Sequence, residues 1–224
     1  MVSRLVVANI SSIGKEGQSK LSNSCIGVAG LGGVGGIAFE LLVRAGVGKI
    51  KVSDGGFFEQ SNANRQSLWS IQRDGRQKVE VAEEFAKQTN PSCKIEKYGK
   101  ISKSNSAAFA SGCNAVIDAT DTAFSRKAVF SGCKKEGVPY IFASARESRG
   151  MLCVFRGKDM AKEFGLARRL PKGLPCDHAL GPVSNCIGCL AAQQAINIVV
   201  GKPALLFPKV LLFDAFSCEP FSIF

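Results

Sequence analysis

Short apolar runs alternate with amphipathic segments along the first two thirds of the chain. Residues 25–29 and 49–53 are two such runs, and each has the length and apolar character of a buried strand. Between them, residues 37–45 place apolar side chains at helical spacing, and Gly46 ends this pattern. Because two parallel strands need a helical crossover, this order predicts a right-handed βαβ unit.

The same alternation continues beyond this unit. It predicts helices over residues 78–88, 104–110, 123–134 and 186–200, and strands near residue 95 and over residues 115–118, 140–143, 151–155 and 210–213. Residues 1–24 are expected to form a polar lead-in, and the Gly- and Pro-rich residues 157–185 a mobile crossover loop. We therefore predict one doubly wound, Rossmann-like α/β domain over residues 1–224, with a mostly parallel sheet and additional C-terminal strands.

The composition narrows the class of ligand. The chain of 224 residues carries 29 Lys and Arg against 18 Asp and Glu, and the resulting net charge of +11 suits an anionic ligand such as a nucleotide. The cations are scattered and only two Tyr and one Trp are present, which disfavours a nucleic-acid groove. Nine sparsely spaced cysteines favour a reducing compartment over a secreted disulfide scaffold. Neither a signal peptide nor a membrane span is expected, so the predicted location is the cytoplasm.

A glycine-rich turn follows the first predicted strand. Gly30, Gly32, Gly33 and Gly35 fit the G-x-G-x-x-G fingerprint, and Asp54 follows 19 residues after the last of them, at the end of the second strand. Small residues let the backbone approach phosphates at a helix N-terminus, while a carboxylate accepts hydrogen bonds from ribose hydroxyls. The pattern predicts a nucleotide site, and the alternative is that the glycines serve helix–sheet packing only.

The fingerprint does not separate a dinucleotide used for hydride transfer from ATP used for group activation. The residues after the second strand favour ATP, because Arg65 lies in a polar run there and Lys78 opens the next helix. A triphosphate carries more charge than a dinucleotide, and such cations offset it. Asp121 lies at the carboxyl end of the fourth strand, the edge where doubly wound sheets bind ligands. A carboxylate that faces a triphosphate needs a cation between them, so we assign Asp121 to Mg²⁺.

Together these motifs resemble the ThiF/MoeB/HesA family, whose members are relatives of ubiquitin-activating enzymes. The resemblance runs in order over residues 17–224 and includes the glycine fingerprint, AGVG at 45–48, Asp54, SNANRQ at 61–66, KVE at 78–80, NP at 90–91, DATD at 118–121 and LFDA at 212–215. The combination is very specific. It implies an adenylyltransferase that joins a carboxylate to the α-phosphate of ATP and releases pyrophosphate.

The resemblance also implies roles for individual residues. The implied nucleotide-binding residues are the four glycines of the fingerprint, Asp54 for the ribose, and Asn62, Asn64, Arg65 and Lys78 around the phosphates. Arg65, Lys78 and Asp121 are the implied catalytic residues, with Asp121 as the Mg²⁺ ligand. Family members are usually homodimers, and Arg4 is the candidate for an arginine that reaches into the partner's site.

Two departures from the family pattern bear on the substrate. Gly56 stands where many members have a second carboxylate, so metal binding rests on Asp121. Many activators of sulfur carriers hold zinc with two Cys-x-x-Cys pairs, whereas here only Cys186 and Cys189 form such a pair. We therefore expect a small-molecule carboxylate, with the guanylylpyridinol of mono-iron hydrogenase cofactor biosynthesis, the HcgE reaction, as candidate. The alternative substrate is the C-terminal Gly-Gly of a ubiquitin-like sulfur carrier protein.

Other chemistry stays open at this point. Cys176 and His178 could complete a four-ligand zinc site with Cys186 and Cys189. Alternatively, His178 lies in an exposed loop and the cysteines only pack at the start of a helix. Cys176 could instead form a thioester with an activated carboxylate. The competing function classes are an NAD-dependent oxidoreductase and a non-catalytic module that binds ATP without turnover.

Overall fold

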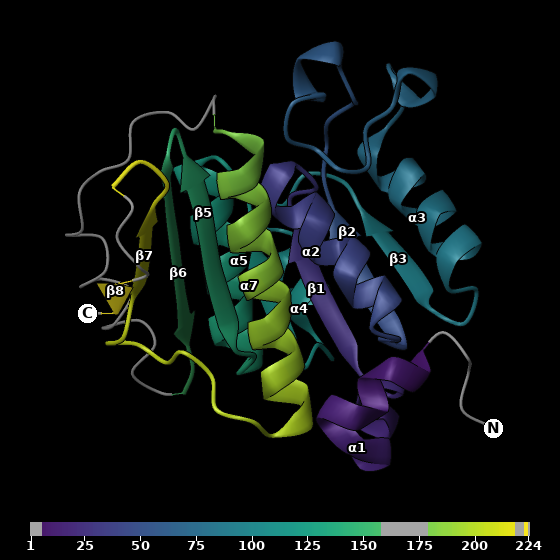
Figure 1. Ribbon diagram of the computed structural model, residues 1–224, viewed down its shortest axis with the longest axis vertical. Helices are drawn as coiled ribbons and strands as arrows, with labels where there is room; N and C mark the ends of the chain where they lie inside the picture. The colour runs from purple at the N-terminus through teal and green to yellow at the C-terminus, as the bar shows by residue number, and fades with distance from the viewer. Residues whose placement is uncertain (1–5, 158–178, 218–221, 224) are drawn as a thin grey trace.

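The computed structural model describes residues 6–157, 179–217 and 222–223 (Figure 1). One eight-stranded sheet runs in the order β3-β2-β1-β4-β5-β6-β7-β8. Its strands are β1 (Cys25–Ala29), β2 (Lys49–Ser53), β3 (Lys94–Tyr98), β4 (Ala115–Asp118), β5 (Tyr140–Arg146), β6 (Arg149–Phe155), β7 (Leu211–Asp214) and β8 (Ser222–Ile223). Strands β1 to β5 are parallel and β6 to β8 are added antiparallel. The predicted doubly wound, mostly parallel α/β sheet is confirmed.

Helices cover both faces of this sheet (Figure 1). The helices are α1 (Val7–Ser22), α2 (Gly33–Arg44), α3 (Lys78–Thr89), α4 (Ser106–Ala110), α5 (Ala123–Glu136) and α7 (Gly181–Val200), with 3-10 turns η2 (Gln60–Asn62) and η3 (Ile71–Arg73). On one face α7 packs against α2, β5 and α1, and α2 also contacts α3; on the other face α4 packs against α5.

Strand side chains alternate between the two layers. Ile117 and Ile141 belong to the apolar cluster under α2 and α7, whereas their neighbours Val116 and Tyr140 belong to the cluster under α4 and α5. Both faces of the central strands are therefore buried, as is usual for parallel sheets. The carboxyl ends of the strands are left as the edge where a ligand can bind.

The apolar character of α7 follows from its position in the core. This 20-residue helix reaches a mean hydropathy of 1.4, and in the part of the chain that the structure describes it is the one helix long and apolar enough to cross a membrane. Its side chains Val183, Ile187 and Ala191 are buried, and the helix packs against α2 and β5. Packing within the domain accounts for its composition.

Residues 7–22 of the predicted polar lead-in form a helix that the sequence pattern did not predict. Helix α1 occupies most of this segment and bends at Gly14, whose φ of 71° is not helical. Leu21 is buried, and Gln18 Nε2 donates to Ala45 O at 3.0 Å. Glycines at 14 and 17 lower the intrinsic helix propensity, so this helix is stabilised by tertiary contacts that the local sequence does not reveal.

The predicted crossover loop also ends earlier than expected. Helix α7 begins at Gly181 rather than at Cys186, with Pro182 in its first turn, where the missing N–H is not needed. Residues 158–178 of that loop lie outside the described residues. Strand β8, which the sequence pattern did not predict, pairs with β7 at the edge of the sheet.

A close backbone approach makes the glycine at position 35 essential to the fold. A Cβ atom on Gly35 would lie 1.8 Å from Gly30 O, whereas one on Gly36 would lie 3.4 Å from Leu31 O, an ordinary contact. We expect Gly35→Ala to lower the free energy of unfolding by at least about 2 kcal/mol, because backbone atoms must move. Gly36→Ala, the matched control in the same turn, should change it by less than about 1 kcal/mol. Urea unfolding measures both, and equal midpoints would contradict the prediction.

Candidate functional site

A cavity of about 560 Å³ opens at the carboxyl ends of the parallel strands. Its walls are the segments that follow β1, β2, β3 and β4, together with the end of β5 and the start of α7. Its charged lining residues are Asp54, Glu59, Arg65, Lys78, Lys100, Asp121 and Arg126. Four cations against three carboxylates leave the lining with a positive formal charge, which suits a polyanionic ligand.

The glycine turn forms one wall of the cavity. Gly30, Gly32 and Gly33 line it, and α2 begins at Gly33, so the positive end of the helix dipole and its unpaired amides lie at the wall. Gly30 has φ 87°, and a Cβ atom there would lie 2.7 Å from Ala119 O. Gly35 does not line the cavity; it serves the packing of α2 against the turn. Three of the four fingerprint glycines thus lie where a phosphate could approach.

Asp54 lines the cavity at the end of β2. Its Oδ2 accepts a hydrogen bond from Leu31 N at 2.7 Å, and its Oδ1 accepts one from Gly56 N at 2.7 Å. The carboxylate therefore braces the glycine turn, a role that the sequence did not predict. Each carboxylate oxygen has a second acceptor site, so Asp54 keeps the capacity for the ribose hydroxyls predicted for it.

The segment after β2 supplies two of the predicted phosphate ligands. Asn62 is 7% exposed, and its Oδ1 accepts a hydrogen bond from Glu59 N at the start of η2. Arg65 Nη1 donates to Ser61 O at 3.0 Å and to Asn64 Oδ1 at 2.8 Å. Asn62 and Arg65 line the cavity, whereas Asn64 does not. Asn64 orients the guanidinium group of Arg65 instead of lying against the cavity.

Lys78 reaches the cavity from the first residue of α3. Its Nζ lies 5.7 Å from the centroid of the Phe58 ring, and its backbone N–H donates to Gly56 O at 3.1 Å. A Cβ atom on Gly56 would lie 3.8 Å from Lys78 Nζ and 3.1 Å from Asp54 Oδ1. The space beside the ammonium and the carboxylate is open because position 56 has no side chain.

Asp121 lines the cavity from the loop that follows β4. It is exposed, and in the described ranges it has no hydrogen-bond or ion-pair partner. Its loop is held by Asp118, which is fully buried and accepts hydrogen bonds from Thr120 N, Thr120 Oγ1 and Tyr140 Oη. Burial and the neighbouring carboxylate raise the pKa of Tyr140 well above its ordinary value, so the phenol stays a donor. A free carboxylate on an anchored loop is a suitable Mg²⁺ ligand.

The sequence reasoning missed several polar lining residues, among them Gln66, Lys100 and Arg126. Gln66 Oε1 and Arg126 Nη1 are buried and lack a hydrogen-bond partner among the described residues. Arg126 Nη2 donates to Ala143 O at 3.3 Å, and Nη1 lies 3.8 Å from Asp118 Oδ2. Buried polar groups are normally paired, and both residues line the cavity, so both atoms are available to a ligand or a water molecule there.

The sequence contained enough information to find only some of these three residues. Arg126 lies in the first turns of the helix after the fourth strand, and a search for cations at that edge of the sheet would have found it. Gln66 lies in the SNANRQ motif at residues 61–66, but its side-chain amide is uncharged. The reasoning from phosphate charge that selected Arg65 and Lys78 therefore could not select it. Lys100 follows the edge strand β3, and only the fold brings it to the cavity.

The candidate zinc and thiol residues are not assembled by the described part of the chain. Cys186 and Cys189 lie one turn apart on α7, and burial raises the pKa of both thiols. Within the described ranges, no group of three or more His, Cys, Asp or Glu side chains could hold a metal ion. Cys176 and His178 lie outside those ranges, so the zinc set and the thioester both stay predictions.

Comparison with known proteins decides the family of this chain. The model of the ThiF family matches residues 4–224, which include the glycine turn, the segment around Arg65, and Asp121. The chain belongs to the ThiF family. Among ThiF-family relatives, the molybdopterin-synthase adenylyltransferase of Escherichia coli K12 is 30% identical over 209 residues, covering 91% of this chain and 84% of the relative.

Other relatives are longer than this chain. The adenylyltransferase and sulfurtransferase MOCS3 of Drosophila virilis is 30% identical over 217 residues, covering 94% of this chain but 48% of the relative. The chain thus spans about half the length of the MOCS3 relatives that it matches. A crystal structure of E. coli MccB with ATP superimposes with a TM-score of 0.81 at 19% identity, over 100% of this chain and 71% of that one. At this identity the likeness establishes a shared fold.

Proposed function

We propose that this protein is an ATP-dependent adenylyltransferase that activates the C-terminal carboxylate of a small carrier protein and releases pyrophosphate. The observation that carries the proposal is the cavity itself, where the start of α2, four cations and the free carboxylate of Asp121 surround space for a nucleoside triphosphate. Family membership supports the reaction class, since the relatives are named adenylyltransferases. An NAD-dependent oxidoreductase is disfavoured by the same clustered cations.

The reaction asks for alignment and charge neutralisation more than for proton transfer. A substrate carboxylate is ionised at neutral pH and attacks the α-phosphate without a general base. Arg65 and Lys78 offset the phosphate charge, and the first turn of α2 supplies amide donors at the glycine turn. The orphaned Nη1 of Arg126 is a donor for an oxygen of the nucleotide or of the incoming carboxylate. Asp54 holds the ribose while it braces the glycine turn.

The residues present fit a Mg²⁺ ion bound with the nucleotide. Mg²⁺ in such sites is held by one or two carboxylates together with substrate phosphates and waters. Asp121 supplies one carboxylate with free acceptor oxygens, and Gly56 leaves open space where a second carboxylate would stand. The ion would neutralise charge on the phosphates of ATP. Asp121 and the nucleotide together are its expected ligands.

The names of the relatives favour a carrier protein over a small molecule. They include a sulfur carrier protein adenylyltransferase of Thermus thermophilus, 29% identical over 217 residues, and a SAMP-activating enzyme E1 of Haloferax volcanii, 28% identical over 211. None of these relatives is named for a guanylylpyridinol, the substrate that the missing second Cys pair favoured. The small carboxylate is therefore kept as an alternative substrate in the test below and is not the main proposal.

The deciding experiment is ATP–pyrophosphate exchange with the full chain and Mg²⁺. One arm supplies ubiquitin-like carriers that end in Gly-Gly, a second supplies the same carriers lacking the last glycine, and a third supplies the guanylylpyridinol carboxylate. We expect exchange with intact carriers only. Exchange with the pyridinol alone would replace the carrier proposal, and tight binding of Mg-ATP without exchange in any arm would favour a non-catalytic module. Tight binding of NADH with none of Mg-ATP would overturn the adenylyltransferase.

Two further features accompany this proposal. The homodimer implied by the family resemblance predicts that an inactive variant mixed with wild-type chain changes the activity per wild-type site, since Arg4 would act across the dimer. Arg4 lies outside the described residues. The cytoplasmic location also stays a prediction.

Arg65 provides the test of phosphate binding. We expect Arg65→Ala to lower the rate of pyrophosphate exchange by about 10²–10³-fold, because one charged contact to the transition state is worth about 3–4 kcal/mol. Its lost hydrogen bonds are exposed, so the midpoint of urea unfolding should hardly move. Arg76→Ala is the matched control, since Arg76 pairs with Glu84 on the surface at 2.7 Å and does not line the cavity. Equal rates for the two variants would show that Arg65 does not bind phosphate.

A further inference from the structure

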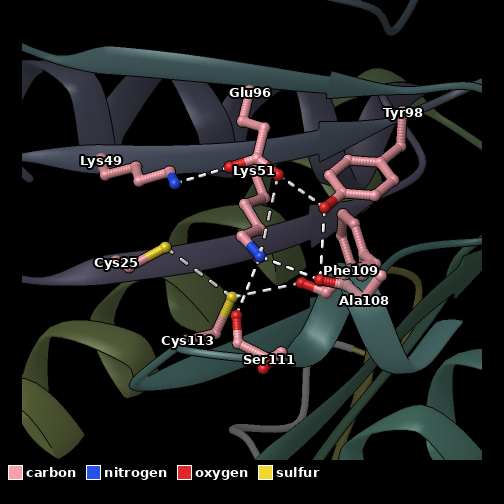
Figure 2. Close-up of polar contacts among 9 residues, drawn as sticks. All are labelled: Cys25, Lys49, Lys51, Glu96, Tyr98, Ala108, Phe109, Ser111 and Cys113. Atoms are coloured by element: carbon pink, nitrogen blue, oxygen red, sulfur yellow. Dashed lines mark hydrogen bonds and ion pairs between the residues drawn. The ribbon is translucent and has the colours of Figure 1, made fainter. Parts of the chain in front are cut away.

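A cluster of thiols and lysines lies at the amino end of the sheet, opposite the cavity (Figure 2). Cys25 is the first residue of β1, and Cys113 comes just before β4, the neighbouring strand. Their Sγ atoms are 3.8 Å apart. Asn114 N donates to Cys25 O at 2.7 Å, and Cys25 N donates to Asn114 Oδ1 at 2.9 Å. These hydrogen bonds therefore hold the two thiols side by side, in a place that adenylation does not use.

A buried ammonium group lies beside this pair. Lys51 is 6% exposed, and its Nζ donates to Ala108 O at 2.9 Å and to Ser111 O at 2.8 Å. Figure 2 shows this lysine extending from β2 towards the thiols, with the Tyr98 ring on its other side. Its nearest carboxylate, Glu96, is 3.8 Å away and forms a closer ion pair with Lys49. Neutral carbonyls thus hold the Lys51 ammonium, and its charge is only partly compensated.

The environment divides the two thiols into one that ionises and one that does not. A hydrogen bond from Cys113, with the charges of Lys49 and Lys51, lowers the pKa of Cys25 to about 7 against the opposing effects of burial and Glu96. The same hydrogen bond and burial raise the pKa of Cys113. A thiolate is the nucleophilic form of cysteine. Cys25 is half-buried, so a small reagent can reach it, while Cys113 is buried next to it.

We propose that Cys25 and Cys113 form an oxidation site for small hydroperoxides, which convert the pair into a disulfide. The Cys25 thiolate attacks the hydroperoxide, the O–O bond breaks, and the alkoxide or hydroxide leaves with a proton as alcohol or water. Cys25 is then a sulfenic acid. The Cys113 sulfur displaces the hydroxyl group from Cys25, the S–S bond forms, and the thiol proton and hydroxide leave as water. The two thiols together lose two electrons, and one hydroperoxide molecule accepts them.

Four other described cysteines have raised pKa values and are poorer sites for this chemistry. Burial raises the pKa of Cys93 to about 12, and it also raises the pKa of Cys133. Cys186 and Cys189 form the Cys-x-x-Cys pair on α7, yet the pKa of each is raised. This second pair is the internal control, because Cys189 is exposed and differs from Cys25 in its electrostatic environment.

The test uses the full, reduced chain and hydrogen peroxide at about one equivalent near pH 7. Intact mass spectrometry should show the loss of two hydrogen atoms, and non-reducing peptide mapping should join Cys25 to Cys113. Cys25→Ser should abolish this product, while Cys113→Ser should leave a Cys25 sulfenic acid that dimedone traps. The control variant Cys186→Ser/Cys189→Ser should oxidise as the wild type does. A first disulfide elsewhere, or a sulfenic acid in the wild type that never closes on Cys113, would overturn the proposal.

Two further readouts are independent of product mapping: the alkylation rate of Cys25 tests the electrostatics, and the Tm of the oxidised protein tests the cross-link. Alkylation of Cys25 should rise with pH through a midpoint near 7, and Lys49→Gln should move that midpoint upward. At pH 7 Cys25 should react at least about fivefold faster than Cys189. The disulfide spans a sequence separation of 88 residues and should raise Tm by about 4–16 °C. A midpoint unmoved by Lys49→Gln, or an unchanged Tm on oxidation, would contradict the site.

The oxidised protein should keep its rate of pyrophosphate exchange. Strand β1 separates Cys25 from the glycine turn by five residues, or about 16 Å of extended chain. The strands β1 and β4 are already paired in register, so the cross-link needs only a local approach of the two sulfur atoms. Exchange and oxidation are separate assays, and the failure of either proposal leaves the other intact.

Discussion

Replacing Asp121 by alanine is expected to lower ATP–pyrophosphate exchange by about 10²–10³-fold. The side chain is the free carboxylate of the cavity, so its loss would remove the proposed Mg²⁺ ligand and the alignment of the phosphates that depends on it. Because it has no partner within the described residues and is exposed, we expect the free energy of unfolding to change by less than about 0.5 kcal/mol. Exchange assays and urea unfolding on the same preparation measure the two effects.

Two variants sharpen this prediction. Asp121→Asn keeps the size of the side chain and removes its charge, and it should lose nearly as much activity as the alanine variant. Glu136→Ala removes an exposed carboxylate at the end of α5, outside the cavity, and should leave exchange unchanged. If Asp121→Asn retained wild-type exchange over a range of Mg²⁺ concentrations, Asp121 would not be the metal ligand. A partial loss that excess Mg²⁺ restores would support the assignment.

Replacing Asp118 by alanine is expected to cost about 3–5 kcal/mol of stability, because it breaks a fully buried polar network. Asp118 is fully buried and accepts hydrogen bonds from Tyr140 Oη and from Thr120. Its removal takes away the acceptor of the buried Tyr140 phenol and of the Thr120 amide, and it leaves Arg126 without its nearest carboxylate. Urea unfolding should show a lower midpoint with an unchanged m-value.

Tyr140→Phe is the matched control for this network. It removes one donor to Asp118 and keeps the ring, which packs edge-on against Phe130 with centroids 5.4 Å apart. We expect a smaller loss of about 1–3 kcal/mol. If Asp118→Ala unfolded at the same urea concentration as Tyr140→Phe, the carboxylate would not be the centre of the network. Exchange activity should fall in Asp118→Ala as well, because Asp121 lies on the loop that Asp118 anchors.

The core of the fold could be predicted because burial in the core is what produces the pattern of apolar residues along the chain. Central strands such as β1 and β4 are buried on both faces, so they appear in the sequence as continuous apolar runs bounded by polar turns. The helix α2 is amphipathic for the same reason. Peripheral elements gave weaker signals: α1 contains two glycines and is stabilised by packing against α7, and β8 has two residues.

For the site, the sequence by itself determined the parts whose chemistry depends on residue type and order. The glycines at 30, 32 and 33 line one cavity together with Asp54, Arg65, Lys78 and Asp121, which lie at the ends of strands or in the segments that follow them, where the sequence placed them. Parallel strands bring their carboxyl ends to one edge, so residues far apart in the chain meet there whatever the details of packing. The place of the site follows from that rule, and the predicted phosphate-bearing ligand follows from the glycines and cations found there.

Only the tertiary structure decided which polar side chains form hydrogen bonds within the protein and which are left available to a ligand. In the structure Asn64 accepts a hydrogen bond from Arg65 and does not line the cavity, Asp54 accepts two backbone hydrogen bonds, and Lys100 and Arg126 join the lining. The tertiary structure also placed Cys25 against Cys113 across neighbouring strands. These outcomes depend on distances between segments far apart in sequence, and on which polar atoms burial leaves unpaired. A one-dimensional pattern records residue type and spacing, and it carries neither of those quantities.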